Sequence, residues 1–258
     1  MNTNSNTYTI IYSAVLVVIV AAALAFAANT LKEPQEKNIE IEKKMNILMS
    51  VGKAADASNA QDKNTYIEEE YSKYIVDEYL VNTKGEKVDG SAFNTDLKVE
   101  LQKPNPEDRQ LPVFVCNDNG KTLYILPVRG AGLWGAIWGY ISLEDDFNTV
   151  YGATFDHASE TPGLGAEIAT PPFQNKFIGK KIYEGDRFVS VEVVKAGLPV
   201  DEHKVDGISG GTITSVAVGT MFSNSLSNYH AFFTSQKSSA LKTVSFKEKA
   251  RKHKDNVN

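Results

Sequence analysis

An uninterrupted apolar run near the N-terminus constrains this chain more than any other feature. From Tyr8 to Ala28 every residue is uncharged, and most are Val, Ile, Leu or Ala. A helix of this length rises roughly 30 Å, which matches the hydrocarbon core of a bilayer. The run therefore predicts one membrane-spanning helix, and we assign residues 1–30 to an N-terminal membrane anchor.

A cleaved signal peptide is the alternative interpretation of this run, because Ala25-Phe26-Ala27 resembles a cleavage site. No basic segment precedes the run, however, and the run is longer than the apolar core of a usual signal peptide. A retained anchor is therefore favoured.

The charges that follow the anchor give no clear orientation. The lysines alone would favour a cytoplasmic C-terminal side, but they are interspersed with glutamates. The charged residues of this flank are Lys32, Glu33, Glu36, Lys37, Glu40, Glu42, Lys43 and Lys44.

The rest of the chain has the composition of one folded domain with an accessory region. Of 258 residues, 42% are hydrophobic and 10% aromatic, which is enough for a sizeable core. The net charge of −5 gives no general electrostatic footprint for nucleic acid. Cys116 is the only cysteine and follows the strand-like run Leu111–Val115, so we expect a buried, inert thiol and no internal disulfide.

Residues 31–110 are interpreted as a stalk helix and an acidic accessory region. Apolar residues among charges from Asn38 to Val51 predict the stalk helix. Thr65 and Glu68 fit a capping box for a second helix, which would extend to Tyr79.

From Asn82 to Asp108 we expect turns around one short strand near Leu97 to Leu101. A domain core is assigned to residues 111–240 and a basic polar tail to residues 241–258. Strands are predicted within the core at residues 111–116, 136–143, 150–155 and 188–194.

The most informative stretch for function is Asp206-Gly207-Ile208-Ser209-Gly210-Gly211-Thr212-Ile213-Thr214-Ser215. Its glycines permit positive φ and close approach by another molecule. Apolar residues from Val218 to Phe233 then recur at helical spacing, so a helix should follow, capped by Thr214 or Ser215. A glycine-rich loop that leads into a helix N-terminus is suited to hold a phosphate.

Two other interpretations of this stretch remain open. It is compatible with an ordinary turn before a helix. Gly207-x-Ser209-x-Gly211 also fits the nucleophile elbow of serine hydrolases, for which the available acid and histidine downstream are Glu248 and His253 in the polar tail.

Asp-Gly-Ile-Ser-Gly-Gly-Thr-x-Thr resembles the flavinylation motif of the FMN-binding domains in bacterial respiratory Na⁺ pumps and their relatives. The resemblance implies that Thr212 carries FMN through a phosphoester to the ribityl phosphate, beside Ser209, Gly210, Gly211 and Thr214. Gly211 stands where alanine is commoner in that family.

Two further segments resemble flavin contacts of the same family. Trp134 lies in Arg129-Gly130-Ala131-Gly132-Leu133-Trp134-Gly135, and the matching tryptophan of the family borders the flavin. Glu160-Thr161-Pro162-Gly163-Leu164-Gly165 resembles a second flavin-contact loop, which implies roles for Glu160, Thr161, Leu164 and Gly165. Lys195, at the end of a predicted strand, is a candidate to lie beside the phosphate or the flavin edge, or else is a solvated lysine.

No metal site is expected. His157 and Glu160 stand three residues apart, but the other histidines form no ligand pattern with them and no HExxH is present. No nucleotide fingerprint such as G-x-G-x-x-G after a strand appears either, so the chain itself is not expected to bind NADH.

The combined resemblance covers nearly the whole chain and is closer to the longer C subunits of Na⁺-translocating NADH:quinone reductases than to the shorter G subunits of Rnf complexes. It implies an α+β fold: a curved, mainly antiparallel sheet with flanking helices, attached to a single membrane span.

The activity that the resemblance implies is electron relay through covalent FMN during quinone reduction coupled to Na⁺ export. No catalytic residue is expected on this chain alone. The implied partners are other subunits of the complex, a flavin transferase for maturation and membrane lipid, with no nucleic acid. The implied location is the bacterial inner membrane, with the flavin domain on the periplasmic side.

A G-type electron-transport subunit, an anchored serine hydrolase that uses Ser209, and a flavin-free anchored interaction domain remain alternatives.

Overall fold

The computed structural model describes residues 5–238, and this part of the chain divides into two units, with the boundary between Lys44 and Met45. The first unit holds most of helix α1 (Asn6–Met49), which runs unbroken through Pro34. Its most apolar 18-residue stretch has a mean hydropathy of 2.7, so the helix is long and apolar enough to cross a membrane. No part of this stretch is buried against the rest of the chain. The predicted anchor and stalk therefore belong to one continuous helix.

The second unit is built on a six-stranded sheet with the order β2-β1-β3-β4-β5-β6, in which every neighbouring pair is antiparallel. The strands are β1 (Ile75–Val81), β2 (Lys87–Val88), β3 (Leu111–Asp118), β4 (Lys121–Ala131), β5 (Ala136–Leu143) and β6 (Val150–His157). The expected α+β fold with a mainly antiparallel sheet and flanking helices is confirmed.

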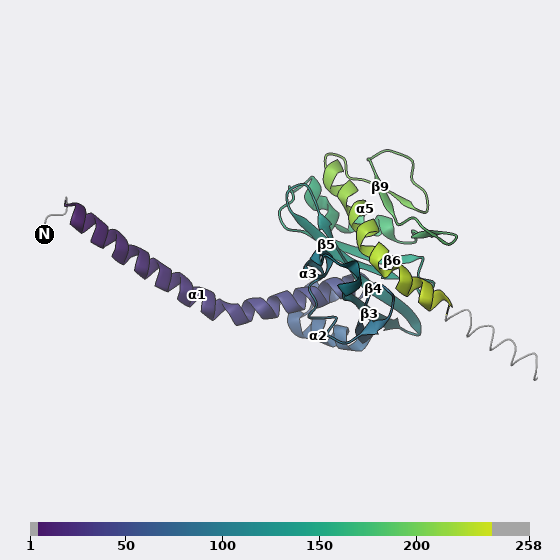
Figure 1. Ribbon diagram of the computed structural model, residues 1–258, viewed down its shortest axis with the longest axis horizontal. Coiled ribbons are helices and arrows are strands. Elements are labelled where there is room, and N and C mark those ends of the chain that lie inside the picture. The colour runs from purple at the N-terminus through teal and green to yellow at the C-terminus, as the bar shows by residue number, and fades with distance from the viewer. Residues whose placement is uncertain (1–4, 239–258) are drawn as a thin grey trace, which may run out of the picture. The chain divides into compact units, whose positions relative to one another are not determined.

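Both faces of this sheet are covered, since the side chains of a strand point alternately to opposite faces. One face of the sheet packs against α5 (Thr212–Leu226), which Figure 1 shows crossing the strands, and buries Leu126, Val128, Phe222 and other residues. Ile125, the neighbour of Leu126, belongs instead to the cluster on the other face, with Cys116 among its buried members. Burial raises the pKa of the Cys116 thiol to about 11, which fits the predicted inert cysteine.

Shorter elements complete the second unit. Four of them precede β3: η1 (Ala55–Ser58), α2 (Lys63–Tyr74), α3 (Leu97–Gln102) and η2 (Pro106–Asp108). Those that follow β6 are η3 (Gly165–Ala169), α4 (Pro171–Gln174), η4 (Asn175–Phe177), the hairpin β7 (Tyr183–Glu184) and β8 (Arg187–Phe188), the parallel pair β9 (Glu192–Val194) and β10 (Lys204–Asp206), and η5 (Ser227–Tyr229) after α5.

The helix predicted to extend to Tyr79 ends earlier. It stops at Tyr74, and the chain continues directly as β1, which pairs with β3 through contacts such as Tyr79 opposite Val113. The predicted capping box is also wrong: Asp62 is the N-cap, and its side chain accepts hydrogen bonds from the backbone N–H groups of Asn64 and Thr65.

The strand predicted near Leu97 to Leu101 is a helix, α3. The alternation of Leu97, Val99 and Leu101 is typical of a strand, but Asp96 caps a helix there by accepting a hydrogen bond of 2.8 Å from the N–H of Lys98. Asn82 to Asp108 also contributes the short strand β2, so this region is part of the sheet.

The strand predicted over residues 188–194 is interrupted. Ser190 lies between β8 and β9 with a φ of +63°, a left-handed conformation that breaks the extended run. The chain therefore turns there, and β9 pairs with β10 instead of continuing β8. The predicted basic tail, residues 241–258, lies outside the described residues.

Candidate functional site

Three segments that are distant in sequence line one pocket of about 460 Å³ in the second unit. They are the turn between β4 and β5, the loop after β6, and the loop that leads into α5. The lining residues are Leu133, Trp134, Glu160, Thr161, Leu164, Gly165 and the stretch Gly210–Thr214. The volume lies within the range usual for small-molecule and cofactor sites.

The first segment is the tight turn that carries Trp134. The N–H of Gly132 donates a 2.7 Å hydrogen bond to the carbonyl of Gly135, which closes the β4–β5 hairpin. Ser159 Oγ donates to the carbonyl of Trp134 at 2.9 Å. These two hydrogen bonds fix the backbone of the turn around Trp134, while the residue itself is 66% exposed at the pocket.

The second segment, Glu160 to Gly165, is a compact turn. The N–H groups of Leu164 and Ala166 both donate to the carbonyl of Thr161, and Gly163 adopts a φ of +75° that favours glycine. The side chain of Leu164, 42% exposed, therefore projects from a defined backbone at the pocket.

The third segment brings Thr212 to the first position of α5. Gly211 is the N-cap, and the Gly211 N–H donates to the carbonyl of Ile208 at 3.0 Å. The N–H groups at the start of a helix have no partner within it, so the first turn of α5 offers donors and a positive dipole end beside the pocket.

The expected cap at Thr214 or Ser215 is wrong, because both residues lie inside the first turn of α5. Ser215 Oγ nevertheless stabilises the entry to the helix: it accepts a hydrogen bond from the N–H of Ile208 and donates one to the carbonyl of Thr212, each at 3.2 Å. Thr214 Oγ1 donates at 2.6 Å to Glu160 Oε2.

Glu160 is the charged centre of the pocket wall. It is 4% exposed, and Oε1 accepts a 2.8 Å hydrogen bond from the N–H of Trp134. Burial disfavours the charged carboxylate, but the hydrogen bonds from Thr214 and from the backbone N–H groups of Trp134, Gly135 and Leu133 outweigh it and lower the Glu160 pKa. Glu160 is therefore a buried anion at neutral pH.

The pocket combines two recognition chemistries. Leu133, Trp134, Leu164 and Ile213 present apolar side chains that are 42–66% exposed, a surface suited to a flat ring. The α5 N-terminus is suited to an anion, whereas Glu160 would repel one. A ligand with an aromatic ring and a phosphate would therefore place its phosphate at Thr212.

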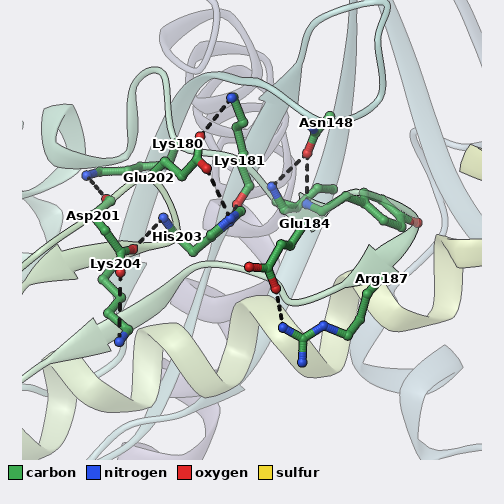
Figure 2. A network of polar contacts seen from close by, with 11 residues as sticks. Asn148, Lys180, Lys181, Glu184, Arg187, Asp201, Glu202, His203 and Lys204 are labelled. Carbon is green, nitrogen blue, oxygen red and sulfur yellow. Dashed lines mark hydrogen bonds and ion pairs between the residues drawn. The ribbon is translucent and has the colours of Figure 1, made fainter.

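A separate polar network, drawn in Figure 2, holds β10, the strand that leads into this loop. Lys180 Nζ donates to the carbonyl of Asp201 at 2.6 Å, and Lys181 Nζ pairs with Glu202 at 2.7 Å. His203 Nδ1 lies 2.8 Å from the carbonyl of Lys181. These contacts fix the chain immediately before Lys204–Asp206, so the glycine loop starts from an anchored strand.

Most of the residues predicted for the site lie together in the pocket lining: Trp134, Glu160, Thr161, Leu164, Gly165, Gly210, Gly211, Thr212 and Thr214. The structure does not bring Ser209 or Lys195 into that lining, and both are exposed. The ammonium that contacts the loop region is instead that of Lys176, which donates to the carbonyl of Asp206 at 3.0 Å.

Sequence reasoning missed Leu133 and Ile213 as lining residues. Each is an apolar neighbour of a predicted site residue, and its position within a glycine-rich segment was the signal that could have identified it. His157 contacts the pocket loop in another way, since its Nδ1 accepts the N–H of Glu160 at 3.2 Å. Among residues 5–238 no group of three or more His, Cys, Asp or Glu side chains is arranged to hold a metal ion.

Comparison with known protein families places an FMN-binding domain at residues 132–227, a range that contains all three pocket segments. Among curated proteins, the chain is 32% identical over 238 residues to the C subunit of the Na(+)-translocating NADH-quinone reductase of Haemophilus ducreyi, covering 86% of this chain and 90% of the relative. The corresponding protein of Vibrio vulnificus is 31% identical over 213 residues, covering 76% and 81%.

Two solved structures are also similar. One is the C subunit of the Na(+)-translocating NADH-quinone reductase from Parabacteroides distasonis, with a TM-score of 0.70 and 47% identity over 79% of this chain and 97% of that one. The other is NqrC of Shewanella oneidensis, with a TM-score of 0.61 and 27% identity over 77% and 98%.

Proposed function

The chain belongs to the family of the C subunits of Na(+)-translocating NADH-quinone reductases, and from this premise we propose that it relays electrons through FMN bound covalently to Thr212. The single observation that carries the proposal is the position of Thr212. It is the first residue of α5 and lies in the pocket lining that the aromatic and apolar side chains share.

The neighbouring hydroxyls are less suited to carry the flavin. Thr214 is 2% exposed, and its hydroxyl donates a hydrogen bond to Glu160. Ser215 is fully buried, and its hydroxyl accepts a hydrogen bond from the N–H of Ile208. Ser209 is exposed but does not line the pocket. Thr212 alone among these four combines access with a place in the pocket lining.

The residues of the pocket fit FMN. Trp134, Leu164 and Leu133 would hold the ring, since flat and apolar side chains complement it. The first-turn N–H groups of α5 would stabilise the single negative charge of the phosphodiester. At Gly210 an added Cβ would lie 2.7 Å from Leu164 Cδ2, so glycine keeps this space open.

Attachment requires a separate flavin transferase that supplies FMN from FAD. The Thr212 oxygen forms a bond to the phosphorus of the flavin phosphate, the bond to the adenylate breaks, and AMP leaves while the hydroxyl proton passes to a base of the transferase. Nothing in the pocket resembles a nucleotidyl-transfer site.

In the complex this chain holds and tunes a redox centre between neighbouring subunits. When bound, FMN accepts electrons and passes them on. Trp134 is exposed at the pocket, so partner proteins are able to approach the pocket there. Those partners supply the donor and acceptor centres. We place the pocket on the periplasmic side of the bacterial inner membrane, anchored by α1, with the basic tail available to a partner subunit or anionic lipid.

Peptide mass analysis tests the attachment site. Trypsin should release Val205–Lys237 as one peptide that carries the mass of FMN less water. Thr212→Ala should abolish the covalent flavin. Thr220→Ala, an exposed threonine of the same helix, should leave it in place.

Two results would overturn the assignment of the attachment site: a flavin mass on Ser209 or Thr214, and a Thr212→Ala protein that stays yellow after denaturation. Attachment in a host that lacks a flavin transferase would instead overturn the requirement for that enzyme.

A further inference from the structure

Glu160 is unusual among the pocket residues because it is buried and charged. Its carboxylate is hydrogen-bonded on both oxygens: Oε1 by the N–H of Trp134 at 2.8 Å and Oε2 by Thr214 Oγ1 at 2.6 Å. A ligand would therefore have to displace an internal hydrogen bond to bind either oxygen. Such bonds to a charged, buried group are costly to leave unmade.

The carboxylate also joins segments that are far apart in sequence. Glu160 lies in the second pocket segment, Trp134 in the turn between β4 and β5, and Thr214 in the first turn of α5. Two glycines make room for it: a Cβ at Gly165 would lie 2.5 Å from Glu160 Oε2, and a Cβ at Gly132 would clash with Oε1. The backbone is thus fitted around this one side chain.

We propose that Glu160 is a positioning residue, which holds the Trp134 turn, the Glu160–Gly165 loop and the start of α5 in their binding arrangement before a flavin is attached. This inference rests on the proposed function, because the identity of the ligand as a flavin comes from there. Glu160 acts through Trp134 and Thr214 and does not bind the flavin itself.

A second consequence follows from the charge. A fixed anion in the wall of a pocket opposes the addition of negative charge to a group held there. Glu160 therefore keeps the midpoint potential of the bound flavin lower than a neutral residue of the same shape would.

Glu100 provides a matched control. It is likewise a buried glutamate, 7% exposed. It accepts a 2.6 Å hydrogen bond from the N–H of Gln110 and forms an ion pair with Lys103 Nζ at 2.6 Å. It lies in α3 and does not line the pocket. Glu100→Ala should destabilise the chain without affecting the pocket segments.

The first experiment needs no flavin. Amide hydrogen exchange is measured on the full-length chain in detergent, made in a host without a flavin transferase. In Glu160→Ala the exchange of two N–H groups should accelerate about tenfold or more: that of Trp134, and that of Ser215, which donates to the carbonyl of Gly211 at the start of α5. Glu100→Ala should leave the exchange of both unchanged. Unchanged exchange in Glu160→Ala would overturn the positioning role.

The second experiment uses the flavin-loaded chain and separates charge from structure. Glu160→Gln removes the charge but keeps the shape, because the Thr214 hydroxyl is able to reverse its role and accept from the amide. Thr214→Val removes one hydrogen bond but keeps the charge, and Thr214→Ser keeps both. The midpoint potential should rise more in Glu160→Gln than in Thr214→Val, and it should stay near wild type in Thr214→Ser.

Equal potentials in Glu160→Gln and Thr214→Val would overturn the electrostatic role, since a purely structural residue would move both alike. If the wild-type chain carries no covalent flavin, the proposed function is wrong but the positioning role of Glu160 is not thereby rejected. The exchange experiment still decides whether Glu160 holds the three segments together.

Discussion

Trp134 and Leu164 show how single residues prepare this site. Their backbones are held by internal hydrogen bonds, yet their side chains remain 66% and 42% exposed. A large exposed indole is unfavourable in water unless something covers it. The flavin ring of the proposed function would provide this cover.

The first prediction at this scale concerns the ring contacts. Trp134→Ala and Leu164→Ala should leave the flavin attached, because neither touches the phosphoester, but should shift its absorbance and change its fluorescence. Since both side chains are exposed, stability should change by less than about 1 kcal/mol. Leu198→Ala, an apolar residue 53% exposed outside the pocket lining, is the control and should leave the spectra unchanged. Spectra identical to wild type in both pocket variants would remove Trp134 and Leu164 from the flavin site.

At the scale of elements, the site depends on glycines where two segments approach closely. Gly165 begins η3 and faces Thr214 of α5: an added Cβ would lie 2.7 Å from Thr214 Oγ1 and 2.5 Å from Glu160 Oε2. That position lies beside the Glu160–Thr214 hydrogen bond, too close to both of its oxygens. The two elements therefore approach only because this residue has no side chain.

Gly165→Ala should consequently separate η3 from α5 and destabilise the chain by about 1–3 kcal/mol through overpacking. It should also reduce flavin attachment. Gly163→Ala is the matched control, since a Cβ there meets nothing within 4 Å and the substitution brings only backbone strain at a φ of +75°. Thermal unfolding and the fraction of flavinylated chain measure both effects. Equal attachment in the two variants would contradict the close approach.

The elements also show how far the sequence alone could predict this structure. The strand over residues 136–143 was predicted with its observed bounds, because alternation and the preceding glycine turn agree with the pairing. The region near Leu97 was misassigned, since a capping aspartate overrode an alternating pattern. Residues 75–79 were predicted as helix but belong to β1, where they pair with β3, and such pairing depends on residues more than 30 positions away.

The candidate site was predicted better than the accessory fold. The family resemblance rests on local glycine-rich motifs, and the residues it implies, among them Trp134, Leu164 and Thr212, lie together in one pocket lining. The contact of Lys176 with Asp206 was not predictable, because no short-range pattern relates them. Lys195 was chosen for proximity in sequence, and its side chain is exposed.

For the whole molecule, the boundary between the two units gives a test. The unit that begins at Met45 contains the sheet and the pocket, and Ile47, Leu48 and Val51 in it are at most 1% exposed. Deletion of residues 1–28 removes the apolar run and none of these residues. The shortened chain should therefore be soluble without detergent, with an unchanged unfolding temperature.

A deletion that extends through Val51 should behave differently, because it also removes Ile47, Leu48 and Val51, each of which contributes about 1.5–3 kcal/mol by burial. Its cooperative unfolding transition should be lost or shifted strongly downward. Calorimetry or circular dichroism on the two truncated chains measures the difference. Aggregation of the shorter deletion, or normal stability of the longer one, would contradict this division.

Translation delivers Thr212 before it delivers the residues that complete the core. Phe222, Leu226, Tyr229 and Phe232 all follow it, and each is at most 1% exposed in the folded chain. While these residues are still being synthesised, one face of the sheet lacks its cover, and the start of α5 has no helix behind it. A maturation enzyme that recognises the folded loop therefore meets its acceptor only after the ribosome has finished this part of the polypeptide. If the proposed function holds, the yellow colour of the product would then mark chains that have been synthesised at least through these core residues and folded around them.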